Sequence, residues 1–246
     1  MPEKQKFYTS FHDLSPREYM YIPEGHLYIG KPGSFSRIEL GHLFIAIGVL
    51  TIAFSFTFSK NSVLFFLLGS DINIANYFYF MPFAFLGIIT AFFIHELSHK
   101  FMAQKYRLWS EFRMYPRGLL LSVIIAFSTG LVFATPGAVM FRGKARLFET
   151  GRIATAGPAS NIIIAIITYI LYHFVFLKME FWGTLIGFIC LVNLLLATFN
   201  LLPFSPLDGK KVIEWNSIIW FVLFSISVLF LSGMFIGENL LFKFFI

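Results

Sequence analysis

The sequence predicts an all-α polytopic membrane protein with about five to six transmembrane helices and one re-entrant, partly strand-like segment. Of its 246 residues, 57% are hydrophobic and only 13% are charged, whereas roughly a quarter are charged in an ordinary soluble domain. Phenylalanine alone occupies 34 positions. A soluble chain of this size could not bury so much apolar surface in total. Lipid must therefore be the solvent for much of the chain.

Uncharged windows of about the length that crosses a bilayer recur along the chain. They cover residues 40–59, 72–94, 118–141, 153–177, 181–207 and 215–237. The connections between them are too short for an inserted soluble module, so we expect one membrane-embedded domain, 40–246, without a PDZ-like or other regulatory domain. The preceding segment, 1–39, mixes charges with aromatic residues, which is typical of a chain at the cytoplasmic surface or in the headgroup region.

The window 118–141 does not fit a single crossing. Basic residues flank it on both sides, and both ends would then belong to the cytoplasmic face, where Lys and Arg accumulate. Glycines and Pro136 within it also disfavour one straight helix. We therefore interpret this window as re-entrant, with flanking stretches that form short strands with an unpaired edge. With five true spans, all basic residues except Lys60, Lys178 and Lys243 fall on one side.

Two histidines and a glutamate end a stretch that carries no charge from Ile72 to Ile94. His95 and His99 are four residues apart, so on a helix they lie on one face, about 6 Å apart, and can bind one Zn²⁺ ion. Glu96 cannot ligate at the same angle, but it can take a proton from a metal-bound water. The pattern H-E-x-x-H also arises by chance. In a membrane helix, however, each unpaired ionisable group costs at least ~2.5 kcal/mol, which favours the metal site.

A catalytic zinc needs a third protein ligand and an open position. Asp208 is the candidate, because Pro203 and Pro206 break the fourth span near its cytoplasmic end, on the same face as the histidines. The alternative is an ordinary helix end with a solvated aspartate. Glu149 and Glu214 are weaker candidates, because they sit at loop or span ends.

Three motifs in this order resemble the site-2 protease family of intramembrane zinc metalloproteases. They are HELSH at 95–99, GPASN at 157–161 and NLLPFSPLDG at 200–209. The resemblance covers the chain from about 79 to 212. It implies that His95, His99 and Asp208 bind one zinc ion per chain.

The same resemblance implies that Glu96 is the general base and that a strand-like element dips into the membrane between the first two motifs. It also implies that Asn161 and Asn200 contact the substrate backbone or the oxyanion. Both are buried amides that need partners, and a peptide substrate would supply them. The alternative is that both amides only join neighbouring helices.

The predicted function is therefore hydrolysis of a peptide bond within or near a transmembrane segment, with a zinc-bound water as nucleophile. The expected partners are a transmembrane protein substrate and the lipid bilayer, and no nucleic acid; the oligomeric state and any regulatory membrane partner stay open. We expect a multi-pass protein with a cytoplasmic N-terminus and an active site near the cytoplasmic face. The alternatives are a membrane metal-ion transporter, a prenyl-protein endopeptidase or a catalytically inactive scaffold.

Overall fold

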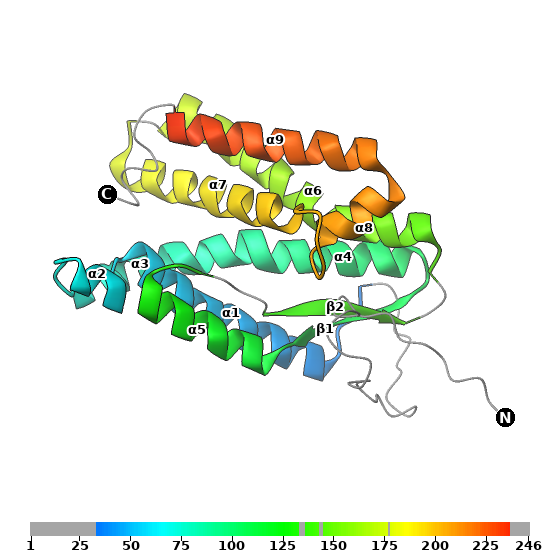
Figure 1. Ribbon diagram of the computed structural model, residues 1–246, viewed down its shortest axis with the longest axis horizontal. Helices are drawn as coiled ribbons and strands as arrows, with labels where there is room; N and C mark the ends of the chain where they lie inside the picture. Colours follow the sequence, from blue (N-terminus) through cyan, green and yellow to red (C-terminus); the bar gives the residue numbers. More distant parts are fainter. Residues whose placement is uncertain (1–32, 133–135, 143–144, 177, 237–246) are drawn as a thin grey trace.

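The computed structural model describes residues 33–132, 136–142, 145–176 and 178–236 (Figure 1). Most of the predicted N-terminal segment, 1–39, lies outside these residues. Within the described part, 5 helical spans are long and apolar enough to cross a membrane. The chain is a multi-pass membrane protein, and the prediction of a helical fold with one strand-like segment is confirmed.

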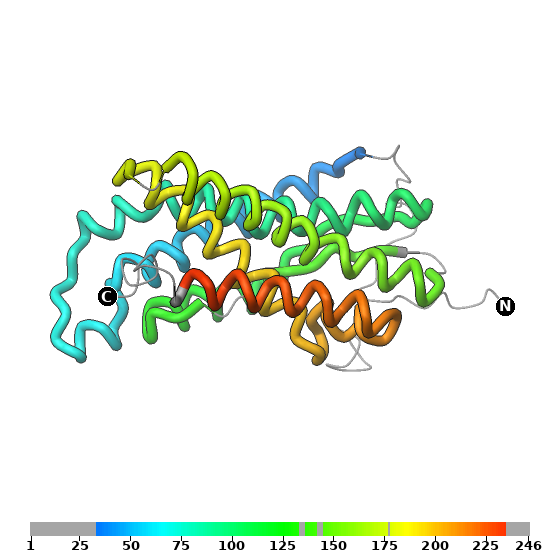
Figure 2. The backbone as a smooth tube through the Cα atoms, turned by 90° about the horizontal axis from the view of Figure 1, so that it is seen from above, coloured from blue at the N-terminus to red at the C-terminus, as the bar shows by residue number. Residues whose placement is uncertain are grey.

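The five spans follow one another along the sequence and lie side by side in the molecule (Figure 1). The first contains α1 (Arg37–Phe58) and α2 (Val63–Leu67), and the second contains α3 (Ile74–Ile88), the π-helix η2 (Ile89–Phe93) and α4 (Ile94–Lys105). The third contains α6 (Leu147–Leu171) and the π-helix η3 (Tyr172–Phe176), and the fourth is α7 (Glu180–Asn200). A short helix, α8 (Asp208–Trp215), precedes the last span, α9 (Ser217–Ile236). The start of α1 and the end of α9 lie at opposite ends of the molecule (Figure 2).

The segment between the second and third spans leaves one end of the molecule and returns to it. It consists of β1 (Trp109–Met114), α5 (Pro116–Thr129) and β2 (Gly137–Arg142). Helix α5 lies beside α1 (Figure 1) and ends at Gly130, whose φ of 73° is favourable for glycine. The strands pair antiparallel, with Trp109 opposite Arg142 and Met114 opposite Gly137. Because the outer ends of the two strands are neighbours, both ends of the segment lie on one side, as the re-entrant interpretation requires.

The second span extends past the uncharged window 72–94, through His95 and His99, to Lys105, and the charge of Lys100 within it is neutralised inside the protein. Lys100 Nζ lies 2.5 Å from Glu39 Oε2, and the two side chains are 1% and 0% exposed. Glu39 Oε1 also accepts a hydrogen bond of 2.9 Å from the backbone N–H of Phe112 in β1. This buried ion pair joins α1, α4 and β1, so that α4 continues as a helix to Lys105.

The interior is centred on α7, which packs against α6, α3 and α9. Phe188 of α7 is fully buried, and its ring meets that of Phe58 edge to face at 4.6 Å. Gly87 of α3 lies so close that an added Cβ would stand 2.8 Å from the Phe188 ring. Helix α9 lies on the outside of the bundle (Figure 1) and exposes apolar side chains such as Phe221 and Leu229, as a lipid-facing helix does.

Candidate metal centre

Helix α4 presents two imidazoles on one face, as the spacing of the histidines predicts. His95 is 3% and His99 7% exposed, so both side chains are buried. Their ring centroids are 4.6 Å apart with the planes at 84°, and the two Nε2 atoms are 3.0 Å apart. Two ring nitrogens therefore converge on one point.

The third side chain comes from the first residue of α8. Asp208 Oδ2 lies 3.4 Å from His95 Nε2 and 3.0 Å from His99 Nε2. A tight turn after α7 brings this carboxylate to α4. In that turn, the backbone of Gly209 approaches the carbonyl of Leu201 so closely that a Cβ would collide with it.

The three ligand atoms have the spacing that a tetrahedral zinc site requires. The candidate ligand atoms of His95, His99 and Asp208 all lie within 4.8 Å of one another. With Zn–N and Zn–O distances of about 2.0–2.1 Å, the edge of a zinc tetrahedron is about 3.3 Å long. The three observed separations, 3.4, 3.0 and 3.0 Å, are close to this length. The donor set of two imidazoles and one carboxylate also suits zinc.

Helix α6 forms the wall behind the imidazoles. His99 Nδ1 lies 2.7 Å from the backbone oxygen of Ile153, so the Nδ1–H group donates there and Nε2 keeps a free lone pair toward the centre. A Cβ on Gly157 would stand 2.6 Å from His95 Nε2 and would also collide with His99 Nε2. Only glycine lets α6 approach the two rings this closely.

Asp208 also interacts with Lys211, whose Nζ lies 3.4 Å from the second carboxylate oxygen, Oδ1. Burial alone raises the pKa of the Asp208 carboxyl. When His99 is protonated, its charge, the charge of Lys211 and the hydrogen bonds with both imidazoles outweigh this effect and hold the pKa of Asp208 well below its ordinary value. The carboxylate therefore stays ionised, as a metal ligand must be.

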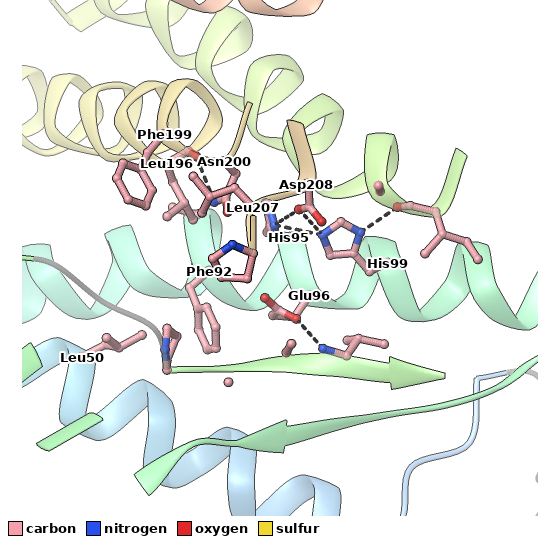
Figure 3. Close-up of a pocket in the computed structure, with 18 of the residues that line it drawn as sticks. Leu50, Phe92, His95, Glu96, His99, Leu196, Phe199, Asn200, Leu207 and Asp208 are labelled. Atoms are coloured by element: carbon pink, nitrogen blue, oxygen red, sulfur yellow. Dashed lines mark hydrogen bonds and ion pairs between the residues drawn. The ribbon is translucent and has the colours of Figure 1, made fainter. Parts of the chain in front are cut away.

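Glu96 points from α4 toward β2, whereas the histidines point toward Asp208 (Figure 3). The Oε2 atom of Glu96 accepts a hydrogen bond of 3.1 Å from the backbone N–H of Val139. Strand β2 therefore fixes this carboxylate beside the three candidate ligands. In an antiparallel strand, the N–H and C=O groups of one residue point to the same side, and the side alternates along the strand. The backbone groups of Gly137, Val139 and Phe141 accordingly face away from β1.

A cavity of about 130 Å³ connects these groups. Its lining includes His95, Glu96, His99, Asp208, residues 136–139 of the β2 region and Asn200 at the end of α7. Asn200 Nδ2 donates to the backbone oxygen of Leu196 at 3.0 Å, and the side chain lines the cavity (Figure 3). Asn161, the other amide singled out in the sequence, is 0% exposed and lies outside this lining.

The sequence motifs do not reveal several supporting groups. The carbonyl of Ile153 and the N–H of Val139 are backbone groups, which no side-chain pattern predicts. Lys100 carries a signal, because it is a charge directly after His99 in a helix of apolar character, but its partner Glu39 is 61 residues away. The glycine of the GPASN motif is a further signal, and the contact of Gly157 with both imidazoles explains why glycine stands there.

The sequence is similar to three proteins that are named as zinc metalloproteases. The chain is 35% identical over 192 residues to "Putative zinc metalloprotease MJ0611" of Methanocaldococcus jannaschii, covering 77% of this chain and 90% of that protein. It is 32% identical over 154 residues to "Putative zinc metalloprotease YwhC" of Bacillus subtilis, covering 54% of this chain and 68% of that protein. It is also 28% identical over 152 residues to "Zinc metalloprotease MJ0392" of Methanocaldococcus jannaschii, covering 62% and 39%, respectively. No family model and no solved structure matches the sequence.

Proposed function

The chain belongs to the site-2 protease family of zinc metalloproteases, and from this premise we propose that it hydrolyses a peptide bond within or near a transmembrane segment of a membrane-protein substrate. The observation that carries the proposal is the convergence of His95, His99 and Asp208 beside Glu96, in one cavity that β2 also lines. A zinc ion held by these three ligands would leave one position open for catalysis.

Zinc held there by His95, His99 and Asp208 would supply Lewis-acid chemistry: it would lower the pKa of a water and polarise the scissile carbonyl. Glu96 supplies the proton transfers. Its Oε2 is held by the Val139 N–H, so Oε1 takes the proton from the attacking water and then delivers it to the amine that leaves. The water oxygen bonds to the carbonyl carbon and the C–N bond breaks; one water proton passes through Glu96 to the new amine, and the other stays with the new carboxyl group.

Strand β2 supports binding of an extended substrate. A helix keeps its carbonyls in internal hydrogen bonds, so a transmembrane substrate must unwind locally before it can be attacked. In lipid, each backbone group freed by unwinding costs several kcal/mol unless it finds a partner. The outward-facing backbone groups of Gly137 and Phe141 can pair with the substrate as an added strand, together with the C=O of Val139, whose N–H binds Glu96. Asn200 faces the same cavity and can bind a further substrate peptide group.

The orientation follows from the distribution of charge. Exposed basic residues lie at the end of α4 and around the start of α6, the two helices that meet at the candidate metal centre; they are Lys105, Arg107, Arg146 and Arg152. Basic residues flank the cytoplasmic ends of membrane spans. We accordingly place the N-terminus and the active site at the cytoplasmic face.

Comparison of the native protein with its Glu96→Gln variant tests the proposal. Membranes that contain either form are analysed for new N-termini within or beside transmembrane segments. The proposal expects fragments that accumulate only with Glu96 intact and disappear when zinc is removed by a chelator. Identical fragment sets from the two forms, at equal expression and equal zinc content, would refute it.

A further inference from the structure

The two histidines of the metal centre differ in their support. His99 has an orienting partner, because its Nδ1 lies 2.7 Å from the carbonyl oxygen of Ile153. His95 Nδ1 is buried and has no hydrogen-bond partner among the described residues. A metal-binding imidazole almost always donates its other ring N–H to an oxygen, which fixes both the tautomer and the ring plane. In the present side-chain arrangement of the described residues, His95 lacks this second hydrogen bond.

The register of α4 and α6 brings one amide to the place where the partner is needed. His95 and His99 are one helical turn apart on α4, and α6 packs closely against this face. Along α6, Ile153 meets His99, and Gly157 touches both rings one turn later. Asn161 lies one further turn along the same face, and its side chain interacts with His95.

The Asn161 amide is itself unsatisfied. The side chain is 0% exposed, and its Nδ2 has no acceptor among the described residues. Two side chains that interact thus each bury a donor group, His95 Nδ1–H and Asn161 Nδ2–H, that has no acceptor among the described residues. Both are buried, where an unmade hydrogen bond is costly.

A half-turn of the amide about χ2 exchanges its oxygen and nitrogen and can give both His95 Nδ1–H and the amide nitrogen a partner. The oxygen then accepts from His95 Nδ1–H. The nitrogen takes the place of Oδ1, which lies 3.4 Å from Ser160 Oγ. Ser160 Oγ already donates to the carbonyl oxygen of Gly157 at 2.7 Å, so it is free to accept from the amide nitrogen.

We propose that Asn161 is the positioning residue of His95: its amide oxygen accepts the Nδ1–H proton and directs the Nε2 lone pair toward the metal. Asn161 thus does for His95 what the Ile153 carbonyl does for His99, and α6 orients both imidazoles. The inference rests on the proposed zinc site. It differs from a substrate contact, because Asn161 is fully buried outside the cavity lining.

Zinc affinity measured without any substrate tests this role. The full-length protein is purified in detergent, and the zinc dissociation constant is determined by competition with a chromophoric chelator. Asn161→Leu and Asn161→Ala remove the acceptor, and we expect zinc binding to weaken about 10–100-fold. Asn161→Asp keeps an acceptor oxygen and should recover most of the loss. Cobalt in place of zinc should show altered visible absorption bands in the Leu variant and near-native bands in the Asp variant.

Asn193→Leu is the matched control. Asn193 is also a fully buried amide in a membrane span, and its Oδ1 has no partner within the described part of the chain. It lies on α7, however, where its Nδ2 donates to Thr90 Oγ1 and to the backbone oxygen of Ile189. This variant should bind zinc like the wild type. Native zinc affinity in both Asn161→Leu and Asn161→Ala would overturn the inference, and a raised KM in those variants would assign Asn161 to the substrate instead. If Asn161→Leu does not fold, the smaller Ala variant and the Asp variant decide. A wild-type protein that binds no zinc would instead refute the metal site itself.

Discussion

Replacement of Gly157 by alanine should destroy the metal centre while leaving the fold intact. The added Cβ would stand 2.6 Å from His95 Nε2 and even closer to His99 Nε2, whereas ordinary contact begins at 3.4 Å. The His95 ring must therefore retreat by about 0.8 Å, or α6 must move away from α4 by a similar distance. Metal–ligand distances tolerate only about 0.2 Å. At least one imidazole should be lost as a ligand.

The expected result is a zinc dissociation constant raised about 100-fold or more, which is at or beyond the upper end of the loss caused by supporting groups. Competition with a chromophoric chelator measures it, and elution by size-exclusion chromatography reports whether the variant remains folded. Gly48→Ala is the control, because Gly48 is also a glycine within a membrane span and a Cβ there would meet nothing within 4 Å. Native zinc affinity in a folded Gly157→Ala protein would refute the geometry of the site.

Four further results are expected. Glu96→Gln should retain zinc, because all three candidate ligands remain. Its turnover should fall about 10²–10⁴-fold, because the proton transfer is removed. Parallel measurement of zinc content and cleavage rate checks both results. Cysteines that replace Arg113 and Arg146 in a cysteine-free background should react with an impermeant reagent from the same side of the membrane, and labelling from opposite sides would contradict the re-entrant segment. Lys100→Met leaves the buried Glu39 carboxylate without its charged partner and should lower the free energy of unfolding by about 3–5 kcal/mol, measured by denaturant titration. The double variant with Glu39→Gln should recover most of this loss. An unchanged stability of the single variant would show that the ion pair is dispensable. Finally, glycine, proline or asparagine near the scissile bond of a substrate should accelerate cleavage relative to a run of leucines, because unwinding costs less; equal rates at matched insertion would exclude unwinding as the limiting step.

The sequence predicts the parts of this site that depend on local spacing. The i, i+4 separation of His95 and His99 places both imidazoles on one face of any helix, and the structure brings their Nε2 atoms to 3.0 Å. Asp208 could be selected because the prolines before it end a span at the correct membrane face. Helix α7 indeed ends at Asn200, before Pro203, and α8 begins at Asp208.

The sequence does not predict the groups that hold these side chains in place, because they come from distant segments. The Val139 N–H that binds Glu96 is 43 residues away, and the Ile153 carbonyl that binds His99 is 54 residues away. Periodicity carries no information about which face of α6 meets α4. A motif glycine such as Gly157 signals a close approach, but only the packed structure shows that the close neighbours are the two candidate metal ligands, His95 and His99.

The uncharged window alone does not give the length of the second span. The window 72–94 ends where the first charges appear, yet the helix continues to Lys105. The reason is that Lys100 is neutralised by Glu39 in the interior rather than exposed at the membrane surface. A hydropathy scale scores every charged residue as unfavourable within a membrane span, whereas a charged residue that is buried and paired can lie within one.

X-ray absorption at the zinc edge of the purified protein tests the central claim most directly. We expect one zinc ion per chain, bound only by nitrogen and oxygen atoms at about 2.0–2.1 Å. The spectrum should also contain the multiple scattering that two imidazole ligands produce. The imidazole contribution should fall in His95→Ala. A protein without stoichiometric zinc, a sulfur ligand, or a spectrum that His95→Ala leaves unchanged would contradict the assignment of His95, His99 and Asp208 as the metal centre.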